Sequence, residues 1–132
     1  MATVWQRCYE DSWKGWITDE SFCHPAKMAR GLLESIFSHL QNAYGLARGA
    51  VVLDPFGGIG STGIIGGLRG YRVVCVELEP KFVALAERNF ELHRRTWETF
   101  GDPLPVMIQG DSRRLRELVG SVLVEWSHRP ST

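Results

Sequence analysis

A short apolar run that ends in an acid and a cluster of glycines constrains the fold of this chain more than any other feature. Residues 50–53 read Ala-Val-Val-Leu, and residues 54–60 read Asp-Pro-Phe-Gly-Gly-Ile-Gly. A continuous apolar run indicates a strand buried on both faces, and glycines allow the tight turn by which such a strand passes into a helix. We therefore expect a parallel strand, a glycine turn and a helix over about 61–68.

The same alternation continues along the chain. Residues 71–76 form a second β-branched run, residues 82–93 have apolar positions at helical spacing, and residues 104–108 are a third candidate strand. Strands that alternate with helices predict an α/β fold with a parallel sheet and right-handed crossovers. We expect one three-layer domain with its core over 50–126 and a ligand crevice at the carboxyl ends of the strands.

The segments that flank this core are less regular. Residues 1–24 hold five aromatic side chains without a clear period and predict an irregular arm that packs on the domain surface. Residues 25–45 predict an amphipathic helix that begins at Pro25. After the third strand we expect a short helix over about 115–118, a strand over 121–126 and a polar tail over 127–132.

Composition limits the class of protein. Apolar residues make up 44% of the 132 residues, and fifteen basic residues balance fifteen acidic ones, so no overall positive field indicates a nucleic-acid partner. The odd count of three cysteines predicts reduced thiols in the cytoplasm. Cys23 and His24 lack further ligands at metal spacing, and we expect no metal site.

An acidic residue stands at the end of each expected strand. Asp54 suits a cationic amine better than a phosphate, and the turn lacks the Gly-Lys-Ser/Thr ending of a P-loop. Glu77 lies about 20 residues beyond the glycines, where doubly wound nucleoside-binding folds hold ribose hydroxyls. Asp111 follows the third strand, although an acid before Ser112 also suits a helix cap.

Two segments carry a resemblance to a known family. Residues 53–62, Leu-Asp-Pro-Phe-Gly-Gly-Ile-Gly-Ser-Thr, resemble the cofactor loop of adenine-N6 and cytosine-N4 DNA methyltransferases. Residues 24–27, His-Pro-Ala-Lys, resemble the His-Pro-x-x-Lys segment that precedes this loop in one circular order of that family. The resemblance implies a Rossmann-like class I methyltransferase fold that binds S-adenosylmethionine.

The resemblance also implies a role for each matched position. Asp54 and the glycines would hold the methionine moiety, Glu77 the ribose and Asp111 the adenine amine. The implied cofactor-binding residues are His24, Pro25, Lys27, Asp54, Pro55, Phe56, Gly57, Gly58, Gly60, Thr62, Glu77, Leu78 and Asp111.

One motif of the family is missing. Its members place an Asp/Asn/Ser-Pro-Pro-aromatic motif after the fourth strand to hold the flipped base, and this chain has no Pro-Pro pair. We therefore expect a sheet truncated after three or four strands and no catalytic residue in the chain, and a frameshift is one hypothesis for the truncation. DNA would be contacted through missing segments or a partner, and a homodimer or a second polypeptide would complete the sheet.

Other functions share these features. An RNA or small-molecule methyltransferase would have the same pocket, and so would a non-catalytic cofactor-binding subunit. A nicotinamide-dinucleotide domain ranks lowest because the glycine turn opens with an acid. The sequence leaves open the choice between adenine and cytosine, the recognition site and the oligomeric state.

Overall fold

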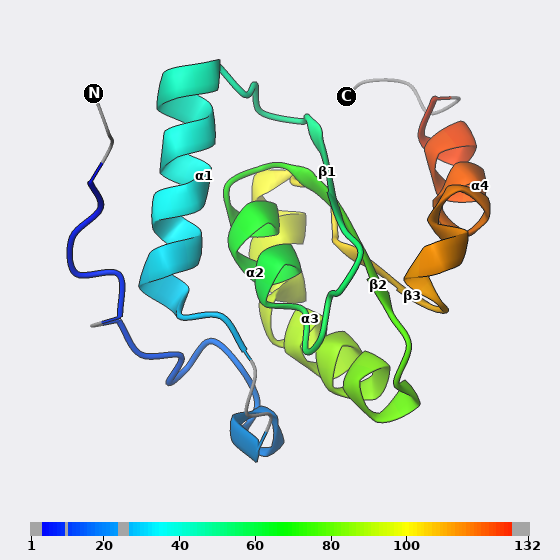
Figure 1. The fold of residues 1–132 in the computed structure, drawn as a ribbon, viewed down its shortest axis with the longest axis horizontal. Coiled ribbons are helices and arrows are strands. Elements are labelled where there is room, and N and C mark those ends of the chain that lie inside the picture. The colour runs from blue at the N-terminus through cyan, green and yellow to red at the C-terminus, as the bar shows by residue number, and fades with distance from the viewer. Residues whose placement is uncertain (1–3, 10, 24–26, 128–132) are drawn as a thin grey trace.

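A computed structural model describes residues 4–9, 11–23 and 27–127, and it shows helices and strands in alternation. Figure 1 shows helices on both sides of a small sheet. In chain order the elements are η1 (Asp19–Cys23), α1 (Arg30–Tyr44), β1 (Val51–Asp54), α2 (Ser61–Leu68), β2 (Arg72–Glu77), α3 (Pro80–Phe100), β3 (Val106–Gln109), η2 (Ser112–Arg114) and α4 (Leu115–Ser127). No helix within these described ranges has the length and apolar character needed to cross a membrane.

The sheet is parallel and has the order β1-β2-β3. Val52 of β1 pairs with Val73 of β2, and Val74 of β2 pairs with Val106 of β3. The predicted α/β fold with a parallel sheet and helices on both faces is therefore confirmed. Because all strands run in the same direction, their carboxyl ends and the loops that follow them lie at one edge.

Strand β2 lies in the middle of the sheet and is buried on both faces. Val73 and Cys75 join the core formed with α1, α2 and α3, whereas Val74 and Val76 contact α4. The side chains of a strand alternate between its faces, so one short strand connects both cores. This explains why an unbroken apolar run, rather than an alternating one, encodes it.

The amino-terminal arm packs onto the helical layer. Trp13 and Ile17 are buried in the main core, and the Trp13 indole N–H donates to the Met28 carbonyl at 2.9 Å. Its segment over 19–23 is a 3₁₀ helix, whereas we expected only irregular structure. Tyr9, in contrast, is largely exposed, so packing accounts for only part of the arm's aromatic content.

The sequence-based prediction of a strand over 121–126 is wrong, because these residues belong to α4. The β-branched run over 122–124 favours a strand when it is considered alone. However, Leu115, Leu118, Val119, Val122, Leu123 and Trp126 recur at helical spacing and bury one stripe against β2 and β3. Burial of this stripe outweighs the local propensity, and the short helix predicted over 115–118 is the start of α4.

Two further helix boundaries differ from the prediction. Helix α1 begins at Arg30 rather than at residue 25, since the described residues 27–29 are not helical. Helix α3 continues to Phe100, well past residue 93. Its buried stripe extends about two helical turns beyond Phe90, to Trp97. The helix predicted over 61–68 is confirmed as α2.

One buried amide ties the arm to the glycine turn. Asn89 of α3 accepts hydrogen bonds from the Thr18 N–H at 2.8 Å and the Ser21 hydroxyl at 3.1 Å. Its Nδ2 group donates to the Ile59 carbonyl, within the glycine turn, at 2.8 Å. Asn89 is fully buried and pairs with the Thr18 N–H and the Ile59 carbonyl, whereas the Ser21 hydroxyl also bonds to the Thr18 hydroxyl at 2.8 Å.

We predict that Asn89→Ala lowers the free energy of unfolding by about 2 to 4 kcal/mol, because it leaves the Thr18 N–H and the buried Ile59 carbonyl without this partner. Chemical denaturation followed by circular dichroism measures this change. Asn42→Ala, at an exposed position of α1, is the matched control and should cost less than about 0.5 kcal/mol. Equal losses in the two variants would show that the amide network does not anchor the arm.

Candidate functional site

The glycine turn after β1 is pressed against the end of β2. The Gly57 N–H donates to the Val76 carbonyl at 2.8 Å. A Cβ at Gly57 would stand 2.6 Å from the Cβ of Cys75, so only glycine allows this approach. Gly60, with φ of 87°, turns the chain into α2.

Asp54 lies at the end of β1 and is held by the turn that follows it. Its Oδ1 accepts from the Phe56 N–H at 3.0 Å, and its Oδ2 accepts from the Thr62 hydroxyl at 2.6 Å. The carboxylate therefore has a fixed orientation beside the amino-terminal turn of α2. Each oxygen keeps acceptor capacity for a further donor.

Glu77, at the end of β2, connects the loops that follow two strands. Its Oε1 accepts from the Gly58 N–H at 3.0 Å, and its Oε2 accepts from the Glu79 N–H at 2.8 Å. The first bond reaches across to the glycine turn after β1. Glu77 thus holds the two loops at a fixed separation.

Asp111 follows β3 and caps η2. Its Oδ1 accepts from the backbone N–H of Arg113 at 2.9 Å, as expected for a helix cap. The Arg113 guanidinium also contacts both carboxylate oxygens, with Nε at 3.0 and 2.9 Å and Nη2 at 2.5 Å. These bonds lower the pKa of Asp111 to about 2, so the carboxylate is ionised at neutral pH.

A small pocket joins the ends of all three strands. Its volume is about 130 Å³, and its lining residues are Pro55, Phe56, Val76, Glu77, Leu78, Gly110, Asp111 and Ser112. Phe56 and Leu78 border it with 78% and 59% of their surfaces exposed. Apolar surface and carboxylates therefore meet at the edge where parallel α/β sheets bind ligands.

The structure brings most of the predicted site residues together. Asp54, the turn over 55–60, Thr62, Glu77, Leu78 and Asp111 all lie at the carboxyl edge of the sheet. Lys27 does not line this pocket; its Nζ lies 5.5 Å from the centroid of the Phe22 ring. His24 and Pro25 lie outside the described residues.

Sequence reasoning missed two residues that shape the site. Arg113 occupies the carboxylate of Asp111, and an acid-x-Arg spacing is too common to identify such a pair. Asn89 supports the glycine turn from behind through Ile59. A polar residue within the apolar stripe of the helix was the available signal for Asn89.

Cys75 lies directly below the turn but is not a nucleophile. Burial, and secondarily the charge of Asp54, raises the pKa of its thiol far above the usual range. The thiol therefore stays protonated and serves as a small apolar side chain. Across the described ranges no group of three or more His, Cys, Asp and Glu residues is arranged to hold a metal ion.

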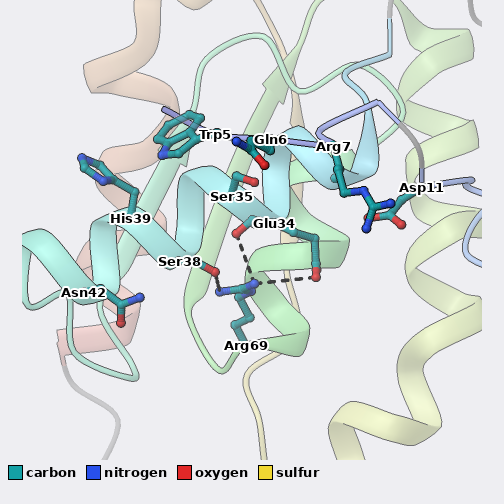
Figure 2. A pocket seen from close by; sticks show the side chains of 11 residues that line it. Trp5, Gln6, Arg7, Asp11, Glu34, Ser35, Ser38, His39, Asn42 and Arg69 are labelled. Carbon is teal, nitrogen blue, oxygen red and sulfur yellow. Dashed lines mark hydrogen bonds and ion pairs between the residues drawn. The ribbon is translucent and has the colours of Figure 1, made fainter. Parts of the chain in front are cut away.

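A larger cavity of about 650 Å³ lies between the arm and α1. Figure 2 shows that Arg69 projects into it and is bonded to Ser38 and Glu34. No residue from the carboxyl ends of the strands lines it, and its polar groups include side chains that already pair with one another. The smaller pocket at the sheet edge is therefore the candidate functional site.

The chain resembles methyltransferases in two comparisons. No curated protein matches it. A solved structure of a protein-L-isoaspartate O-methyltransferase aligns with 64% of this chain and 24% of its own, at 25% identity and a TM-score of 0.44. This chain thus spans about a quarter of that protein's length, and so partial a likeness carries no argument about activity.

The DNA methylase family provides the informative match. It covers residues 1–88, two thirds of the chain, and includes the glycine turn, Asp54 and Glu77. Asp111 lies beyond the matched segment. By this match, the chain belongs to the DNA methylase family of the N6 and N4 methyltransferases.

Proposed function

We propose that this chain binds S-adenosylmethionine at the carboxyl edge of its sheet and serves a DNA methyltransferase that methylates an exocyclic amine of adenine or cytosine. The proposal rests mainly on one observation. The acids at the ends of the three strands lie near the glycine turn after β1, and this turn has no room for a side chain at Gly57. Family membership supports the methyl-transfer reaction.

The donors and acceptors at this edge suit the cofactor. Asp54 keeps acceptor capacity for the ammonium of the methionine moiety, and Glu77 keeps it for the ribose hydroxyls. Asp111 lines the pocket as an acceptor for the adenine amine, and the exposed faces of Phe56 and Leu78 suit a nucleoside ring. When bound, the cofactor supplies an electrophilic methyl group.

The chain's own residues account for binding rather than for chemistry on the base. Methyl transfer to an amine requires a group that holds the amine in line with the methyl, and the Pro-Pro motif that does this in the family is absent from these 132 residues. We propose that DNA is held by polypeptide other than these residues.

The free thiols of all three cysteines support a reducing compartment such as the cytoplasm.

The open edge of β1 offers a place for such polypeptide. The Ala50 carbonyl accepts from the Arg72 N–H at 2.9 Å, so Val51 and Leu53 direct their backbone groups away from β2. Leu53 pairs with Val74 and shares its face, yet it remains 40% exposed, and Val51 remains 46% exposed. An edge with unpaired backbone groups and apolar side chains favours addition of another strand.

We predict that Asp54→Ala and Glu77→Ala each weaken S-adenosylmethionine binding by about 1 to 3 kcal/mol, through loss of a charge-assisted hydrogen bond. Isothermal titration calorimetry measures the affinity. Glu77→Gln keeps an acceptor for the loop N–H groups but removes the negative charge. It therefore separates the effect of the charge on binding from the effect of a disordered loop. Glu79→Ala, an exposed acid two residues away, should bind as the wild type does. Unchanged affinity in both alanine variants would contradict the proposed function.

A separate prediction concerns the edge of β1. Without another polypeptide, we expect the chain to associate with itself through this strand. Multi-angle light scattering at increasing concentration should show dimers, and Val51→Lys should remove them because a charged side chain blocks edge pairing. Val4→Lys, at an exposed position of the arm, is the control. A wild-type chain that stays monomeric at high concentration would show that the edge is protected.

A further inference from the structure

The three acids at the strand ends differ in the hydrogen-bond donors that already contact their carboxylates. Two donors reach Asp54 and two reach Glu77, and these donors are backbone N–H groups and one hydroxyl. Asp111 instead accepts from three donors of one residue, Arg113: its backbone N–H, its Nη2 group and its Nε–H, which is shared between the two oxygens. The guanidinium therefore already contacts both carboxylate oxygens that a ligand would use.

This contact matters for any ligand that uses Asp111. The adenine amine is also a donor, so it competes with the guanidinium for the same oxygens. The backbone N–H of Arg113 can stay in place as the cap.

The guanidinium is well placed for such an exchange. The Arg113 side chain is 88% exposed, so water can solvate it as soon as it leaves Asp111. Exposed ion pairs contribute little free energy, and a ligand donor can therefore compete with this one. A purine with an acceptor in place of the amine would face the opposite situation, because Arg113 could stay on Asp111 and donate to that acceptor.

We propose that Arg113 is a displaceable competitor for Asp111 and that it sets the preference of the site between 6-amino and 6-oxo purine nucleosides. This inference rests on the proposed function, since it assumes that the nucleoside of the cofactor binds beside Asp111. Arg113 thereby weakens binding of the adenine form and supports binding of the hypoxanthine form. The selectivity of the pocket is then a property of the pair rather than of the acid alone.

The test compares two ligands in three proteins. The ligands are S-adenosylhomocysteine, which has the amine, and S-inosylhomocysteine, which has an oxygen at the same position. The proteins are the wild type, Arg113→Ala, and Arg116→Ala as a control that removes the same charge from an exposed position on α4. Calorimetry gives each affinity, and thermal melting checks that the variants are folded.

We expect Arg113→Ala to bind S-adenosylhomocysteine about two- to fivefold more tightly, the size typical of losing one exposed competitor. The same variant should bind S-inosylhomocysteine more weakly, so the two affinities change in opposite directions. Arg116→Ala should change neither. An unchanged ratio in Arg113→Ala, or an equal change in Arg116→Ala, would overturn the inference. A wild type that binds neither ligand would overturn the proposed function and this inference with it.

Discussion

The hydrogen bond from the Gly57 N–H to the Val76 carbonyl, 2.8 Å long, holds the glycine turn against the end of β2. At that distance the backbone of the turn lies in contact with Cys75, and any side chain at Gly57 would separate them. The neighbouring Gly58 N–H can then reach Glu77. Without this approach, Glu77 could not bond to the turn after β1, and the loops that follow β1 and β2 would not be joined at the carboxyl ends of the strands.

The surrounding structure supports that contact from both sides of the sheet. Strand β2 is fixed between two apolar cores, one with α1, α2 and α3 and one with α4. Asn89 holds the outer end of the turn through the Ile59 carbonyl and fastens the amino-terminal arm to the same place. The arm therefore contributes to the order of the site although it supplies no described residue to the pocket lining.

The sequence predicted the parts of the structure that local patterns encode. The helix over 61–68, the central strand and the acids at the strand ends follow from apolar runs, glycines and spacing, and each lies where it was expected. The end of α3 and the part of α4 beyond residue 118 were not predicted, because burial against distant elements decided them. Trp97 and the stripe from Leu115 to Trp126 become informative only when the surface that they cover is known.

The candidate site shows the same division. Its acids and glycines could be predicted, because backbone geometry and charge restrict which residues work there. The pairing of Arg113 with Asp111 could not be predicted, since it depends on the conformation of one short loop. Local patterns thus predict which residues gather at the strand ends, whereas the pairing among their side chains is visible only in three dimensions.

The most direct measurement of the central claim is a ¹H–¹⁵N spectrum of the chain titrated with S-adenosylhomocysteine. The backbone N–H groups of Gly58, Glu79 and Arg113 bond to Glu77 and Asp111, and they should report a ligand at this edge. The account predicts that these three amides shift together and saturate with one affinity. Shifts confined to the cavity between the arm and α1, around Glu34 and His39, with the three amides unchanged, would contradict it.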